Sequence, residues 1–190
     1  MDPFVFALVV VMGGAVAAAA RFRRGARHVE DAERVAAGRI TAPMAESAVR
    51  VGDVLTCLDD EYWLSGELAV VREGTAAMRL FSAPEPGRER WVALPRDGRS
   101  VWVLYVDSEL GSVGWPGVEA PATGRVLRRF EHGNAALVPS GDVANGWEGM
   151  GRFALFQTHD AVAVVVEGPS HNRLALVGRE IPRQLVQKLG

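Results

Sequence analysis

The sequence predicts a mainly β protein: an antiparallel barrel or sandwich-like domain of short strands, preceded by one N-terminal transmembrane helix and closed by a short C-terminal helix. Three observations lead to this prediction. Residues 4–20 carry no charged or polar side chain, short apolar segments separated by turn residues begin at Val51, and no long helical pattern lies between those segments. Strands at such short and regular spacing, without intervening helices, are typical of antiparallel barrels and sandwiches.

The apolar run near the N-terminus is long enough to span a bilayer, which takes about 17–25 helical residues. Arginines that follow the run can lengthen it, because their stems lie along lipid while the guanidinium groups reach the headgroups. We therefore predict a transmembrane helix over residues 4–22. The expected anchor residues are Phe4, Phe6, Leu8 and Val11 in the lipid and Arg21, Arg23, Arg24 and Arg27 at its basic flank.

The charges around this run predict its orientation. Asp2 precedes it and the four arginines follow it. Basic flanks stay in the cytoplasm, so we expect the N-terminus outside the cell membrane and the rest of this single-pass protein inside. Small residues at 15–20 also resemble a signal-cleavage site, but the positive region that should precede a signal peptide is missing. An exported domain after cleavage, or a buried helix, remains the alternative.

A basic juxtamembrane segment is expected over residues 23–50. Residues 29–38 suit a short charged helix with acidic residues in its first turns, and Pro43 marks a linker. The β-rich domain is expected over 51–180, and an amphipathic pattern with Pro182 in its first turn predicts a short helix over 181–190. The strands expected between these limits are 53–58, 62–72, 77–82, 90–95, 100–106, 125–131, 135–138, 152–158, 161–167 and 174–178.

The overall composition narrows the classes of function. A formal net charge of −2 gives no basic field that would mark a nucleic-acid-binding protein. Cys57 is the only cysteine, so an intrachain disulfide is excluded, and its apolar neighbours predict a buried structural thiol.

Several short motifs from Val51 to about Gly178 resemble the bacterial family called domain of unknown function 4178. In order, they are Val51-Gly52-Asp53-Val54, Tyr62-Trp63-Leu64-Ser65-Gly66, Arg90-Trp91-Val92-Ala93-Leu94, Gly133-Asn134-Ala135, Gly141-Asp142, Gly149-Met150-Gly151-Arg152-Phe153 and Glu180-Ile181-Pro182. The resemblance covers about two thirds of the protein, and none of its motifs is a chemical signature. It implies a β-rich domain without an established reaction, in gene neighbourhoods of membrane-stress proteins and polyamine-synthesis enzymes.

The sequence shows no clear motif for catalysis, for a cofactor or for a metal site. The four histidines form no close pair of metal-ligand spacing, and neither a Gly-Lys-Ser or Gly-Lys-Thr phosphate loop nor a Gly-x-Ser-x-Gly elbow occurs. The glycines around Trp147 precede a predicted strand rather than a helix, so we interpret them as turn residues. We therefore expect no enzyme, cofactor or metal. A small-ligand or enzymatic site assembled from scattered residues remains the alternative.

The tryptophans suggest where a partner could bind. Trp63, Trp91 and Trp102 lie in predicted strands and are expected in the core, whereas Trp115 and Trp147 lie among glycines in expected loops. Exposed loop aromatics can mark a binding surface. The candidate partner surface consists of Trp115, Trp147, Arg125 and Arg129. The sequence thus predicts a membrane-tethered cytoplasmic binding or scaffold module, with the bilayer and a protein at the membrane as partners.

Overall fold

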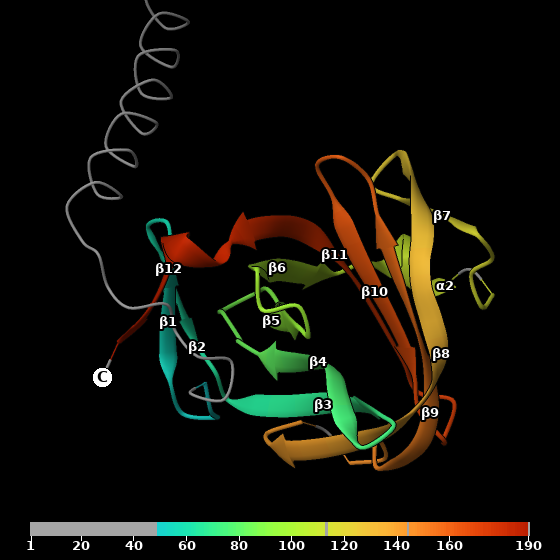
Figure 1. Ribbon diagram of the computed structural model, residues 1–190, viewed down its shortest axis with the longest axis horizontal. Helices are drawn as coiled ribbons and strands as arrows, with labels where there is room; N and C mark the ends of the chain where they lie inside the picture. Colours follow the sequence, from blue (N-terminus) through green and yellow to red (C-terminus); the bar gives the residue numbers. More distant parts are fainter. Residues whose placement is uncertain (1–48, 113, 144, 190) are drawn as a thin grey trace, which may run out of the picture. The chain divides into compact units, whose positions relative to one another are not determined.

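The structure of this protein is a computed structural model that describes residues 49–112, 114–143 and 145–189, all within one compact unit of the chain (Figure 1). It is mainly β, as predicted. In chain order the elements are β1 (Val54–Cys57), β2 (Asp60–Trp63), β3 (Gly66–Arg72), β4 (Thr75–Ser82), β5 (Arg90–Pro95), β6 (Ser100–Val106), α2 (Ser108–Ser112), β7 (Glu119–Ala122), β8 (Arg125–Gly141), β9 (Gly149–Gln157), β10 (Val162–Glu167), β11 (Arg173–Pro182), the 3-10 turn η2 (Arg183–Leu185) and β12 (Val186–Leu189).

Eight of the strands close into an antiparallel barrel in the order β3-β4-β5-β6-β11-β10-β9-β8. Closure comes from β8, whose second half pairs with β3 from Gly66↔Gly141 to Val71↔Ala136. The first residues of the same strand pair with β7, which attaches to the barrel as an extra strand. Because closure leaves no open edge between β3 and β8, the barrel avoids the unpaired backbone groups that an open sheet exposes.

Side chains fill the barrel interior. Alternate residues of a strand point to opposite faces, so every second residue of the eight strands points inward. The inward set forms one buried apolar cluster that includes Leu68, Met78, Leu80, Trp91, Trp102, Leu137, Phe153, Leu155, Val164 and Leu176.

Two further layers cover parts of the outer wall. A three-stranded sheet, β12-β1-β2, packs against the barrel through a second cluster that includes Leu55, Tyr62, Phe81 and Val92. The helix α2 and strand β7 form the other layer, with Leu110 and Ala120 in a third cluster beside Phe156 and Val165. Strands buried on both faces should be apolar throughout, and the runs 91–95 and 162–166 are wholly buried.

Most predicted strands are confirmed, including 90–95 and 100–106 at their observed limits. The two segments predicted at 125–131 and 135–138 are one strand, β8, bent by a bulge between Arg129 and Glu131. The predicted segment 62–72 is two strands of different sheets, β2 and β3.

The predicted C-terminal helix over 181–190 is wrong for the residues described. After the short turn η2, residues Val186–Leu189 form β12 and pair with β1 from Val54↔Leu189 to Cys57↔Val186. The ammonium group of Lys188 lies 2.8 Å from Oδ2 of Asp53 beside this pairing. As a strand, β12 provides hydrogen-bond partners for the backbone N–H and C=O groups at the edge of β1, which a helix would leave unpaired. This long-range pairing therefore prevails over the local amphipathic pattern that predicted a helix.

Of the residues that the sequence predicts to lie in the core, most are buried and one is not. Trp91 and Trp102 are 5% and 4% exposed, as expected, and Cys57 is fully buried. Burial raises the pKa of the Cys57 thiol to about 12, in keeping with a structural role. The expectation that Trp63 lies in the core is wrong, since it is 54% exposed. Its neighbour Tyr62 takes the inward position on β2, so the strand period turns Trp63 outward.

The predicted transmembrane helix over 4–22 and the juxtamembrane segment up to residue 48 lie outside the described residues. Within the part of the chain that the structure describes, none of the helices has the length and apolar character needed to cross a bilayer.

Candidate functional site

A groove of about 390 Å³ lies on the outer wall of the barrel. It is bordered by the β4–β5 loop, the end of β6, the β7–β8 turn, the β9–β10 turn and β11. The residues that line it are Arg88, Tyr105, Val106, Asp107, Thr123, Arg125, Asp160, Ala161, Val177 and Gly178. Its volume is in the range of pockets that hold small ligands or a few side chains of a partner.

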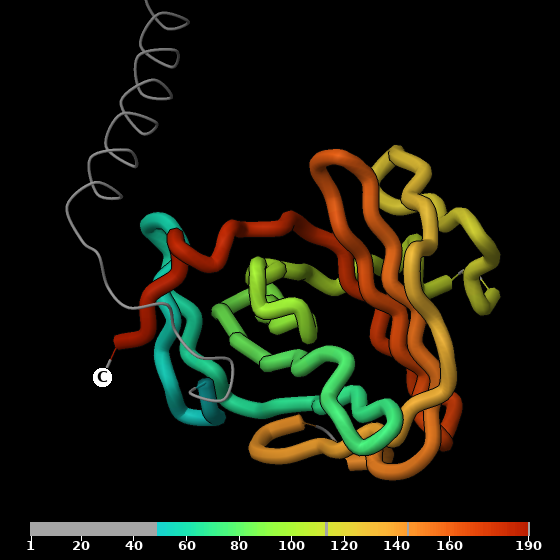
Figure 2. The backbone as a smooth tube through the Cα atoms, viewed as in Figure 1, coloured from blue at the N-terminus to red at the C-terminus, as the bar shows by residue number. Residues whose placement is uncertain are grey.

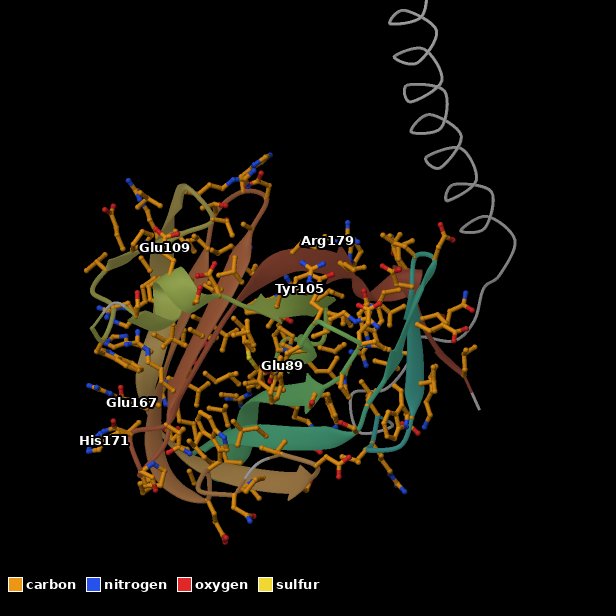
Figure 3. The ribbon with its side chains drawn as sticks, turned by 180° about the vertical axis from the view of Figure 1, so that it is seen from behind. Glu89, Tyr105, Glu109, Glu167, His171 and Arg179 are labelled. Atoms are coloured by element: carbon orange, nitrogen blue, oxygen red, sulfur yellow. The ribbon has the colours of Figure 1, made fainter. Side chains whose placement is uncertain are left out.

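Arg88 and Tyr105 form one side of the groove. Tyr105 points outward from β6, packs partly against the second buried cluster, and is labelled in Figure 3. The guanidinium carbon of Arg88 lies 3.7 Å from the centre of its ring. Such cation–π stacking at an exposed site contributes about 0.5–1 kcal/mol and fixes the plane of the guanidinium group. Arg88 is exposed, so an acceptor from solvent can reach its N–H groups.

The loop that carries Arg88 is itself closed by backbone hydrogen bonds. The amide of Glu85 donates to the carbonyl of Arg88 at 3.1 Å, and the amide of Arg88 donates back at 3.0 Å. Gly87 adopts a φ of +77°, a backbone conformation that residues with a side chain rarely adopt, and so permits this tight turn. The loop therefore presents Arg88 from a defined position.

An ion pair forms the opposite side. Arg125 donates a hydrogen bond to Oδ2 of Asp160, and the Thr158 hydroxyl donates to the other carboxylate oxygen at 3.1 Å. The hydrogen bond with Thr158 and then that with Arg125 hold the pKa of Asp160 below its usual range, against a small opposing effect of burial. Asp160 is therefore ionised near neutral pH, and its charge is balanced by Arg125.

The second carboxylate of the groove, Asp107, is also engaged. Its Oδ1 accepts a hydrogen bond from the amide of Leu110 at 2.7 Å, at the start of the short helix α2. Among the described residues, none places a carboxylate within ion-pair distance of Arg88. Of the two arginines that line the groove, Arg88 therefore carries the positive charge still available to a ligand.

The floor of the groove is apolar and depends on a glycine. Val177 and Ala161 belong to the third buried cluster, and Val106 is 47% exposed. Gly178 is the last residue of β11 that pairs with β10, and beyond it β11 continues alongside β6. A Cβ at position 178 would lie 1.9 Å from the backbone oxygen of Val103, so only glycine allows this approach. Figure 2 shows the resulting path, in which the last red segment leaves the barrel wall towards the small sheet.

The structure does not bring all residues of the predicted partner surface together. Arg125 lines the groove, whereas Arg129 donates a hydrogen bond to the carbonyl of Pro116 at 3.4 Å and so holds the loop after α2. Trp115 on that loop is half-buried beneath the guanidinium of Arg152, 4.1 Å from the ring centre. The expectation that Trp147 is exposed is wrong, because it is 8% exposed and belongs to the barrel interior.

A second polar cluster lies beside Trp115. Arg152 donates to Glu167 at 2.7 and 3.1 Å, and Nδ1 of His171 lies 3.9 Å from the same carboxylate oxygen. Figure 3 shows Glu167 and His171 close together at this edge of the barrel. Arg173 donates to the carbonyls of Leu110 and Gly114, so this cluster secures the loop after α2. Grouped carboxylate, histidine or cysteine side chains that could hold a metal do not occur among the described residues.

Comparison of the chain with known protein families, with curated proteins and with solved structures finds no match. The resemblance to the domain of unknown function 4178 therefore stays a prediction.

Proposed function

We propose that this protein is a membrane-tethered binding module whose barrel domain lies in the cytoplasm and captures a partner protein at the membrane. The observation that carries the proposal is the groove with Arg88 stacked on Tyr105. The tether rests on the apolar run at 4–20 and on the arginines that follow it.

The chemistry of the groove indicates what it binds. Arg88 offers N–H donors to a carboxylate, and charge-assisted hydrogen bonds of this kind are stronger than neutral ones. The exposed side chain of Val106 and the adjoining apolar floor suit a short aliphatic group next to that carboxylate. The ligand class is therefore an acidic peptide segment with a small apolar side chain beside its acidic residue. The second candidate, favoured by the groove's volume, is a small anionic molecule with an aliphatic part.

The orientation can be tested directly with topology reporters. A fluorescent or enzymatic reporter that works only in the cytoplasm, fused to the C-terminus, should be active in cells. Neutral replacement of Arg21, Arg23, Arg24 and Arg27 together should give mixed orientations, because these residues supply nearly all of the charge asymmetry. Periplasmic alkaline-phosphatase activity at the same fusion point would contradict the proposed orientation.

The ligand class can be tested with a designed probe. A peptide of alternating valine and aspartate should bind the full-length protein in detergent, and its affinity should fall about tenfold or more in Arg88→Gln, since a hydrogen bond to a charged group contributes about 1.5–3 kcal/mol. Titration calorimetry measures the effect. Arg128→Gln is the matched control, because Arg128 is a highly exposed arginine whose nearest carboxylate, that of Glu119, lies 3.7 Å away and outside the groove.

Three further ligands distinguish the acidic-peptide proposal from the small-molecule candidate. A valine–asparagine peptide should bind much more weakly, and equal binding would contradict an anionic ligand. Succinate and inorganic phosphate test the small-molecule candidate. Saturable binding of either, lost in Arg88→Gln while the peptide fails to bind, would favour that candidate over partner capture.

A further inference from the structure

The outer face of the β12-β1-β2 sheet carries a row of apolar side chains. In the strand register, Val54 on β1 lies opposite Leu189 on β12 and opposite Trp63 on β2. Directly opposed residues of antiparallel strands project on the same face, so these three side chains form one line across the sheet. Trp63 is 54% exposed and Leu189 is 44% exposed. The other face of the sheet carries Leu55 and Tyr62, which are fully buried against the barrel.

The polarity of this face changes along the strands. The next row consists of Gln187, Thr56 and Glu61, and the β1–β2 turn beyond it carries acidic residues at 59 and 60. The apolar row thus lies at the end of the sheet opposite the acidic turn. At this apolar end, the carboxylate of Asp53 is paired with Lys188 at 2.8 Å, so its negative charge is balanced.

The apolar row is also at the end of the sheet where the chain arrives from the N-terminal segment. The described chain starts at Val49, five residues before Val54, and the amide of Gly52 donates to the carbonyl of Leu64 beside Trp63 at 2.7 Å. Arg50 in this approach is exposed. A cation and an apolar row therefore occupy the end of the domain that leads to the proposed anchor.

We infer that the face formed by Trp63, Val54 and Leu189, the apolar row, lies against the headgroup region of the bilayer as a second membrane contact. Tryptophan is enriched at membrane interfaces because its large ring is apolar while its N–H group stays hydrated. The row has this composition: Trp63 and Leu189 are exposed, and the aliphatic Val54 between them is half-buried. The inference rests on the tether of the proposed function.

The length of the tether explains how so small a surface can be effective. Residues 21–48 separate the apolar run from the described domain, which is 28 residues and spans at most about 100 Å when fully extended. A domain held within that distance of the membrane meets the bilayer at a high effective concentration, so a contact that is weak for a free domain becomes populated. Contact at the row also sets which way the barrel, and with it the groove, faces above the membrane.

The tryptophans provide a specific test. All five lie in the described domain, and none lies in residues 1–48. Trp91, Trp102 and Trp147 are 5%, 4% and 8% exposed, and Trp115 is partly covered by Arg152. Full-length protein reconstituted in phosphatidylcholine vesicles, with lipids brominated near the headgroup, should therefore show fluorescence quenching that comes from Trp63. Quenching should disappear in Trp63→Phe and persist in Trp115→Phe.

A second pair of variants keeps the reporter and changes the contact. Leu189→Glu leaves Trp63 in place but puts a charge in the apolar row, so quenching should fall at least twofold. Val126→Glu introduces the same charge at a valine that is 58% exposed on β8, outside the row, and should leave quenching unchanged. Circular dichroism of both variants checks that the sheet remains folded.

Flotation of the vesicles separates the two proposals. Protein that does not float with the vesicles would overturn the tether, and the inference with it. Protein that floats without bromine quenching would overturn the inference alone. Quenching of equal size in Trp63→Phe would overturn it as well. Shielding of Trp63 from aqueous iodide without bromine quenching would assign the row to a second protein copy and so refute the membrane contact.

Discussion

Replacing Trp91 with alanine is expected to lower the free energy of unfolding by about 3–5 kcal/mol, the range found for loss of a large buried aromatic side chain. Trp91 is 5% exposed and packs inside the barrel, and its indole N–H donates to Oε1 of Glu89 at 3.0 Å. The substitution removes both the apolar contacts and that hydrogen bond, and the closed barrel has little freedom to collapse around the cavity. Urea denaturation followed by circular dichroism measures the change.

Trp63→Ala is the matched control, because it removes the same side chain from another strand. Trp63 is 54% exposed, so the expected loss is below about 1 kcal/mol. Equal effects of the two substitutions would contradict the assignment of Trp91 to the interior and Trp63 to the surface.

The strands of the barrel could be predicted because their information is local. Apolar runs bounded by turn residues mark β5 and β6, and the Pro84–Gly87 and Asp97-Gly98 segments lie where the chain reverses. A strand of this kind is recognisable without knowledge of its neighbour. The fold class therefore follows from the sequence, although closure into a barrel depends on the β3–β8 pairing between residues about 70 positions apart.

The elements that were missed depend on distant partners. Residues 186–189 have a pattern that also suits a helix, and only the open edge of β1, more than 120 residues earlier in the chain, selects a strand. Trp63 and Trp91 both lie in segments that the sequence predicts as strands. Which of them is buried depends on the layer that each strand faces, and β2 belongs to the outer sheet while β5 belongs to the barrel.

The candidate site was predictable to a smaller extent. Arg125 was expected at a binding surface and does line the groove. Arg88 and Tyr105 gave no such signal, because an arginine after a Pro/Gly turn and a tyrosine near a strand end are common, and their stacking appears only when β5 and β6 pair. Trp147 was misplaced because glycines on both sides of it suggested an exposed loop, while in the fold its ring packs into the barrel interior.

Gly178→Ala is expected to have an effect of similar size, at least about 3 kcal/mol of lost stability, which lies at the upper end for overpacking. The added Cβ would lie 1.9 Å from the backbone oxygen of Val103 and 2.8 Å from its carbonyl carbon. Neither is a flexible side-chain end that can move aside, so β11 and β6 must separate where they pair. Because Val177 and Gly178 form part of the groove, this separation should also weaken binding of the acidic peptide in whatever fraction remains folded.

The comparison for this substitution is Gly117→Ala. A Cβ at position 117 would meet no atom within 4 Å, so alanine there should change stability by less than about 0.5 kcal/mol. Thermal unfolding of both variants in parallel separates a steric effect from a general cost of removing glycine. A Gly178→Ala protein as stable as the parent would show that β11 and β6 do not approach each other this closely, and would remove the structural basis for the floor of the groove.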